Sequence, residues 1–141
     1  MKSILNVVKK LSRRIEEEEK RTRYLRDLRD TITPQLDGLP RSPNVAKKIE
    51  WLTAAIVDLE KRIAEFKAIL LTCRIELCEW LMQKISDAEV CSVLFNRYGL
   101  LKKFSAIAME LNYSESVIFR LHRLGLKFLG VQGSFEEYDF E

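Results

Sequence analysis

Residues 105–123, SAIAMELNYSESVIFRLHR, have the pattern of two short helices joined by a tight turn. Ile107 and Ala108 fall on one face of the first helix, and a residue as small as alanine lets a second helix cross closely. Asn112 stands at the turn, where asparagine tolerates a left-handed backbone conformation. Ser114 follows as the expected N-cap of the second helix. The stretch therefore predicts a helix-turn-helix.

The second helix of this motif would bury Ile118 and Leu121 and turn a polar face outward. Arg120 and Arg123 lie one turn apart on that face, and an arginine can bond guanine O6 and N7 or clamp a phosphate. Nearby lysines would bind phosphate without reading sequence. We therefore predict double-stranded DNA as the ligand, with candidate contacts at Ser114, Glu115, Ser116, Phe119, Arg120, Arg123, Lys102, Lys103 and Lys127. The alternative is that the charges are solvated surface residues and that Phe119 fills the core.

The net charge of +3 indicates little by itself, but the charge is unevenly distributed. Residues 97–127 carry six basic and two acidic side chains, which suits a surface that binds nucleic acid. Residues 131–141 carry four acidic side chains and no basic one. This tail could be a docking segment, for example for RNA polymerase, a mimic of DNA that folds back on the basic face, or a solvated extension.

A second pattern, upstream of the motif, predicts a long helix over residues 45–85. Apolar residues alternate there at steps of three and four, which is a heptad seam. The seam includes Ile49, Leu52, Ile56, Leu59, Ile63, Phe66, Leu70 and Leu77. A helix with such a seam needs a partner. The nearest candidate is the preceding helix, which would fold back as an antiparallel hairpin, or coiled coil, with Ile15 opposite Ile63.

The preceding helix is predicted over residues 3–31, where apolar residues recur at the same steps but less completely. Its middle holds a run of four acids, residues 16–19, which point to different sides of a helix and predict a solvated face rather than a metal site. Residues 33–43 hold all three prolines, so we expect a break there. Ser42 should cap the next helix, with Pro43 in its first position.

Self-association is also expected from these two helices. Because the first is shorter and partly polar, it cannot cover the whole seam, which predicts a homodimer formed through the second helix. The alternative is that the uncovered seam is a groove for a helix of another protein.

Residues 86–89 read Ser-Asp-Ala-Glu, which is the sequence of a capping box with Ser86 at the cap. A further helix should begin there, bury Val90 and Val93, and end at Gly99. The chain is thus expected to be all-α, with a helical hairpin at 1–85, a helix-turn-helix module at 86–130 and an acidic tail at 131–141.

Several classes of function are not expected from these residues. One histidine, no glycine-rich phosphate loop and no nucleophile with an evident base give no sign of an enzyme or a cofactor site. The three cysteines form no CxxC pair and match no familiar zinc spacing with His122, so we expect no metal and a reduced, cytoplasmic protein. No segment has the ~20 apolar residues that span a bilayer, and the first residues are too charged for a signal peptide.

Residues 96–129, NRYGLLKKFSAIAMELNYSESVIFRLHRLGLKFL, resemble the carboxy-terminal part of small phage proteins of Gram-positive bacteria. Those proteins pair a long coiled-coil region with a helix-turn-helix similar to region 4 of sigma factors, and they include the ArpU-like and RinA-like late-gene regulators. The matching residues are Arg97, Tyr98, Ile107, Ala108, Leu111, Tyr113, Ser114, Arg120, Leu121, His122, Leu126 and Leu129. Asn112 departs from the glycine common at its position, and Phe119 departs from the tyrosine common at its position.

The resemblance implies a phage-encoded, sequence-specific transcription regulator of late or packaging genes. One alternative is an interaction protein that uses its coiled coil to bind a host factor such as RNA polymerase and does not read DNA sequence. Another is a structural or terminase-like component that binds DNA without sequence discrimination.

Overall fold

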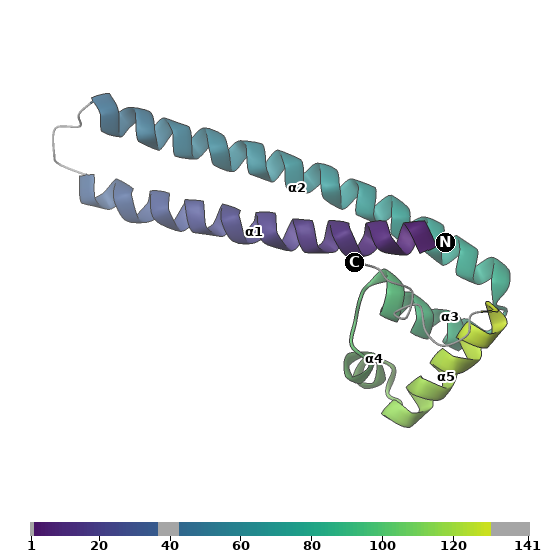
Figure 1. Ribbon diagram of the computed structural model, residues 1–141. Coiled ribbons are helices and arrows are strands. Elements are labelled where there is room, and N and C mark those ends of the chain that lie inside the picture. Colours follow the sequence, from purple (N-terminus) through teal and green to yellow (C-terminus); the bar gives the residue numbers. More distant parts are fainter. Residues whose placement is uncertain (1, 37–42, 131–141) are drawn as a thin grey trace. The chain divides into compact units, whose positions relative to one another are not determined.

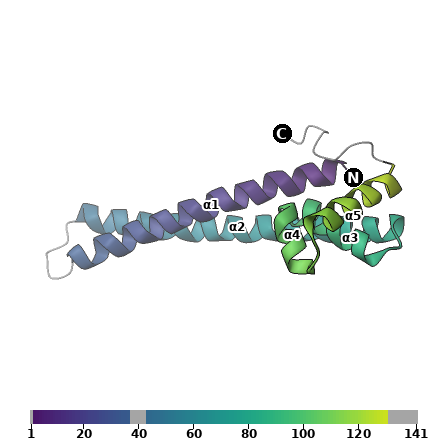
Figure 2. The same ribbon diagram turned by 90° about the horizontal axis from the view of Figure 1, so that it is seen from below.

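The computed structural model describes residues 2–36 and 43–130, and every regular element in them is a helix (Figures 1 and 2). In chain order these are α1 (Lys2–Leu36), α2 (Pro43–Lys84), α3 (Ala88–Leu94), the π-helical turn η1 (Phe95–Gly99), α4 (Phe104–Leu111) and α5 (Glu115–Phe128). The predicted all-α class is confirmed. The chain divides into two compact units. The first unit is Met1–Lys10 with Leu70–Glu141, and the second unit is Leu11–Ile69.

The core of the first unit is shared by its short helices, the end of α2 and the start of α1. Within it, α3 packs against α5, and α4 packs against both α5 and η1. The buried side chains of this core are Leu5, Leu77, Leu81, Ile85, Val90, Val93, Leu94, Tyr98, Ile107, Ala108, Ile118, Leu121 and Leu126. Burying one large apolar side chain stabilises a fold by roughly 1.5–3 kcal/mol, so this core fixes the positions of α4 and α5.

The start of α3 differs from the prediction. Asp87, not Ser86, is the N-cap, because its carboxylate Oδ1 accepts from the backbone N–H of Glu89 at 2.9 Å and of Val90 at 3.3 Å. The predicted cap was therefore wrong by one residue. An ionised carboxylate binds the free amides of a first turn more strongly than a hydroxyl does, which favours the aspartate over its neighbour. The predicted end of this segment at Gly99 is confirmed, with η1 as its last turn.

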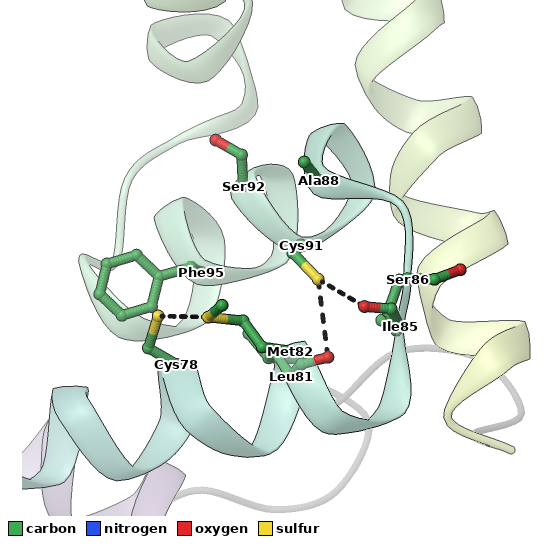
Figure 3. A pocket seen from close by; sticks show the side chains of 9 residues that line it. All are labelled: Cys78, Leu81, Met82, Ile85, Ser86, Ala88, Cys91, Ser92 and Phe95. Atoms are coloured by element: carbon green, nitrogen blue, oxygen red, sulfur yellow. Dashed lines mark hydrogen bonds between the residues drawn. The ribbon is translucent and has the colours of Figure 1, made fainter.

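A thiol joins the start of α3 to the end of α2. The Cys91 Sγ–H donates to the carbonyl oxygens of Leu81 at 3.5 Å and of Ile85 at 3.3 Å (Figure 3). Ile85 follows the last residue of α2, where carbonyl groups have no intrahelical partner. Burial raises the pKa of the Cys91 thiol, so the group stays protonated at neutral pH and can donate.

In the second unit, α1 and α2 lie side by side and run in opposite directions (Figures 1 and 2). Two ion pairs define the direction. Glu19 Oε1 of α1 lies 2.9 Å from Lys67 Nζ of α2, and Arg26 of α1 pairs with Glu60 of α2. A higher number in α1 thus meets a lower number in α2, as antiparallel helices require.

The predicted seam of α2 lies on its buried side. Among its members, Leu52, Ile56, Leu59, Ile63, Leu70 and Leu77 are buried, and Ile49 and Phe66 are half-buried. One copy of the chain covers these side chains by itself. A homodimer formed through α2 would therefore have to use another side of the helix.

The ion pairs between α1 and α2 all lie on one side of the predicted register. With Ile63 opposite Ile15, Arg62 would lie opposite residue 16 and Lys67 opposite residue 11. Arg62 pairs with Glu18 and Lys67 pairs with Glu19, which are two and eight residues further along α1. Apolar residues recur at every helical turn, so their spacing alone leaves the register open.

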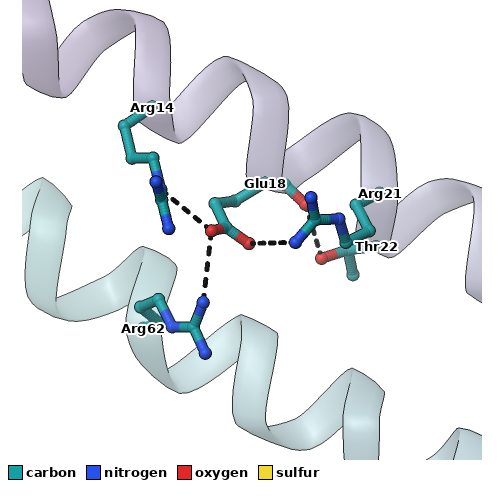
Figure 4. Close-up of polar contacts among 5 residues, drawn as sticks. All are labelled: Arg14, Glu18, Arg21, Thr22 and Arg62. Atoms are coloured by element: carbon teal, nitrogen blue, oxygen red, sulfur yellow. Dashed lines mark hydrogen bonds and ion pairs between the residues drawn. The ribbon is translucent and has the colours of Figure 1, made fainter.

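Glu18 is only 2% exposed, so the prediction of a solvated acidic run is wrong for this residue. Its Oε1 accepts from Arg14 Nε at 3.0 Å and Arg62 Nη1 at 3.3 Å, and Arg21 Nη1 lies 3.9 Å from its Oε2 (Figure 4). Thr22, also buried, donates its hydroxyl to the Glu18 carbonyl oxygen at 2.8 Å. A charged layer therefore interrupts the apolar stripe of α1, and arginines compensate its charge.

The ends of the two long helices also differ in part from the prediction. α1 continues to Leu36, so the predicted break at Thr33 comes about one turn too early. α2 begins at Pro43 as predicted, while the expected cap, Ser42, lies outside the described residues.

Candidate nucleic-acid interface

Two residues set the turn between α4 and α5. Asn112 has left-handed backbone angles, φ 58° and ψ 40°, and its N–H donates to the Ala108 carbonyl oxygen. Ser114 Oγ accepts from the Val117 N–H at 3.3 Å and so caps α5. Both roles confirm the predictions for these two residues. Together they fix the residue at which α5 begins.

One stripe of α5 presents exposed cations. The buried side of this helix consists of Ile118, Leu121, His122, Gly125 and Leu126. On the opposite side, Ser116, Arg120, Arg123 and Lys127 follow one another at steps of four, three and four, and all four are exposed. We call these four residues the α5 row. Its three cations form no ion pair with any residue that the structure describes, so their charge is available to a ligand.

An aromatic cluster fixes the side of α5 next to this row. The rings of Phe119 and Phe104 have centroids 4.8 Å apart, and Phe104 meets His122 edge-on at 5.0 Å. The Arg97 guanidinium lies 4.3 Å from the Phe104 centroid and donates to the Lys102 carbonyl oxygen at 3.0 Å. Phe119 nevertheless stays 42% exposed. The ring is thus positioned by α4 and still reaches the surface beside the α5 row.

His122 lies in the interior of the first unit, where its imidazole is neutral at pH 7. The Tyr98 hydroxyl and His122 Nε2 share a hydrogen bond of 2.7 Å. Burial, followed by the positive charge of Arg97, lowers the pKa of His122 to about 4. A buried neutral imidazole packs and shares a hydrogen bond, so His122 belongs to the core of the first unit and not to the exposed side of α5.

The stability of the first unit should therefore fall when the pH drops from 7 to 5. The folded pKa of about 4 lies below the ordinary 6.5, so the unfolded chain binds the proton first and stability is lost progressively below pH 6.5. The expected loss between pH 7 and pH 5 is about 2 kcal/mol, measured by urea unfolding at both values. In a His122→Gln protein, whose amide can still bond Tyr98 but does not titrate, this part of the pH dependence should disappear. The same pH dependence in both proteins would contradict the burial of a neutral histidine.

The other predicted contacts lie at or just before the starts of α4 and α5. Glu115 is exposed in the first turn of α5, and Lys103 is exposed just before α4. Lys102 Nζ lies 2.6 Å from Glu110 Oε2, so its charge already has a partner. Exposed ion pairs contribute only ~0–1 kcal/mol, so a phosphate could replace the glutamate.

Two residues that position this site were not predicted. Gly125 lies where α5 crosses α3, and a Cβ there would lie 2.6 Å from Leu94 Cδ1. Its only signal in the sequence is a lone glycine inside a helical pattern. Arg74 of α2 donates from Nε to the Gly99 carbonyl oxygen at 2.9 Å and so holds the end of η1. No local pattern marks a contact between residues so far apart in the chain.

Comparison with protein-family models, with curated proteins and with solved structures finds no match for this chain. None of the helices in residues 2–36 and 43–130 is long and apolar enough to cross a membrane. The same residues contain no cluster of three or more His, Cys, Asp or Glu side chains that could hold a metal ion.

Proposed function

We propose that this protein binds double-stranded DNA through α5 and acts as a sequence-specific transcription regulator. The observation that carries the proposal is the α5 row, in which three cations without partners among the described residues lie on one exposed stripe. The resemblance of residues 96–129 to phage late-gene regulators implies that the regulated genes are late or packaging genes, expressed in a bacterial host cell.

The geometry of α5 suits the major groove of DNA. Its 14 residues span about 21 Å, and a single α-helix fits the width of the groove. Ser116 lies in the first turn, where free N–H groups and the helix dipole favour a phosphate. Arg120 and Arg123 lie in the middle of the helix, where an arginine can bond a guanine edge bidentately. Lys127, in the last turn, would add affinity through a phosphate without reading sequence.

A second candidate function is the binding of a protein partner, such as RNA polymerase, through the same helix. Exposed apolar side chains beside the α5 row favour it, namely Leu124 and Phe128. Exposed aromatic residues are enriched at protein interfaces. Under this alternative, the protein does not discriminate between DNA sequences.

Selection from a random duplex library, followed by fluorescence anisotropy, tests the proposal. A sequence-reading regulator should enrich one sequence family and bind it at least ~10³-fold more tightly than scrambled DNA. Equal and steeply salt-dependent binding to all duplexes would instead indicate a DNA-coating component. No binding to any duplex would contradict the proposal and favour the protein-partner alternative.

The double variant Arg120→Ala with Arg123→Ala should lose roughly 10²–10³-fold in affinity for the selected duplex, since each good arginine–base pair contributes about 1–3 kcal/mol. The matched control is Arg13→Ala with Arg23→Ala, which removes the same charge from exposed positions of α1. Anisotropy titrations of both proteins at one salt concentration make the comparison. Equal losses in the two proteins would show that only total charge matters and would contradict the assignment of α5.

A further inference from the structure

One aromatic ring lies among the polar side chains in the amino-terminal half of α5. Phe119 follows Ser116 by three residues and precedes Arg123 by four, so the three side chains lie on the same side of the helix. The ring is 42% exposed, and the members of the α5 row around it are polar and exposed as well. Because an apolar ring gains stability when a ligand covers it, a ligand of this surface should offer an apolar group among its polar ones.

The Phe119 ring is positioned on this surface by α4. Its centroid lies 4.8 Å from that of Phe104, so one part of the ring packs on α4 while the rest stays open to solvent. Phe104 is positioned in turn by His122, edge-on at 5.0 Å, and by the Arg97 guanidinium at 4.3 Å. A side chain that is already ordered loses little conformational entropy when a ligand binds it. Phe119 is therefore suited to a specific contact.

The major groove of DNA offers one kind of apolar group, which is the C5-methyl group of thymine. All other features of its base edges are hydrogen-bond donors and acceptors, and a phenyl ring can pair with none of them. Base edges are contacted by the amino-terminal residues of a recognition helix, and Phe119 lies in the second turn of α5. The other exposed large apolar side chains of α5, Leu124 and Phe128, lie in its second half. Phe119 is thus the apolar residue placed for a base.

We propose that Phe119 selects a thymine, because its ring contacts the C5-methyl group of that base in the major groove. This inference rests on the proposed function and adds an A·T pair to the guanine contacts of Arg120 and Arg123. Neighbouring Cα atoms are about 3.8 Å apart and successive base pairs about 3.4 Å apart. The thymine should therefore lie within about two base pairs of a guanine in the sequence that the protein selects.

Replacement of each thymine of the selected duplex by uracil, one at a time, tests the inference on the full chain. Uracil pairs with adenine as thymine does but lacks the C5-methyl group, so each replacement removes one methyl group and no hydrogen bond. At the position that faces Phe119, the replacement should raise the Kd of the wild-type protein about fourfold, which is the effect of one buried group of this size. The Phe119→Ala protein should bind the thymine and uracil duplexes equally.

The matched control is Phe128→Ala, which removes the same ring from the last turn of α5, where it is 57% exposed. This protein should keep the fourfold preference for thymine. Phe119→Leu retains an apolar side chain and should keep about a twofold preference, which separates loss of the contact from loss of the fold.

Two results would overturn the inference while sequence-specific binding remains intact. One is equal binding of the thymine and uracil duplexes at every position, and the other is a preference for thymine that persists in the Phe119→Ala protein. Absence of binding to every duplex would instead contradict the proposed function, and the inference with it. The two failures are therefore distinguishable in one set of titrations.

Discussion

A Glu18→Lys protein is expected to lose about 3–5 kcal/mol of stability relative to the wild type. Glu18 is buried on the side of α1 that meets α2, with Arg14 at 3.0 Å, Arg62 at 3.3 Å and Arg21 at 3.9 Å. A lysine there would bury a fourth cation among three arginines with no carboxylate to compensate it. Urea unfolding followed by far-UV circular dichroism measures the loss.

The matched control is Glu17→Lys, which makes the same charge change one residue away at an exposed position. Its effect should stay within about 0.5 kcal/mol, as for most surface substitutions. Equal stabilities of the Glu17→Lys and Glu18→Lys proteins would contradict the burial of Glu18.

A Glu18→Leu protein shows what the buried charge contributes. The side chains of Arg14, Arg21 and Arg62 are 53%, 64% and 44% exposed, so they can turn to solvent when the carboxylate is removed. Glu18 Oε2 has no hydrogen-bond partner among the described residues, so its desolvation is incompletely compensated. We therefore expect the stability of the Glu18→Leu protein to equal that of the wild type or to exceed it by up to about 4 kcal/mol. In that case the buried charge serves to fix the register of the two helices and does not stabilise the fold.

Local patterns in the sequence predicted the long helices and the turn of the interface. The strict steps of three and four in α2 predicted its buried side, because a seam of this regularity admits one helical face. Asn112 and Ser114 predicted the turn, because their conformational and capping preferences act within a few residues. The exposure of Arg120 and Arg123 followed from the same local periodicity.

Features that depend on distant residues could not be predicted in this way. Glu18 is an ordinary acid in its own helix, and its burial depends on Arg62, which lies 44 residues further along the chain. The contact of Phe119 with Phe104 likewise depends on how α5 crosses α4. The predicted cap of α3 was wrong for a different reason. Two adjacent residues, Ser86 and Asp87, are both common N-caps, and the capping-box pattern pointed to the serine although the aspartate caps the helix.

Replacing Gly125 by leucine is expected to destabilise the first unit by at least about 3 kcal/mol and to abolish the proposed DNA binding with it. At Gly125, α5 approaches α3 so closely that a Cβ would lie 2.6 Å from Leu94 Cδ1 and 2.9 Å from Val90 Cγ1. Alanine gains about 1 kcal/mol of helix propensity over glycine but meets the same contacts, which cost about 1–3 kcal/mol, so Gly125→Ala should be mildly destabilising. A leucine adds a branched chain in a space already filled by the core, so α5 must move away from α3.

A second substitution tests whether the loss of stability in the Gly125→Leu protein comes from the close contact with Leu94. Leu94→Ala removes the atoms nearest to Gly125, and alone it should cost about 2–5 kcal/mol by leaving a cavity. Combined with Gly125→Leu, the new side chain can fill that cavity, so the double variant should be more stable than the sum of the two losses predicts. Ser105→Leu adds a leucine at an exposed position of α4 and should change stability by less than about 0.5 kcal/mol. Strict additivity of the two core substitutions in urea unfolding would show that α3 and α5 do not meet at Gly125, and the α5 row would then lack the support that this crossing gives it.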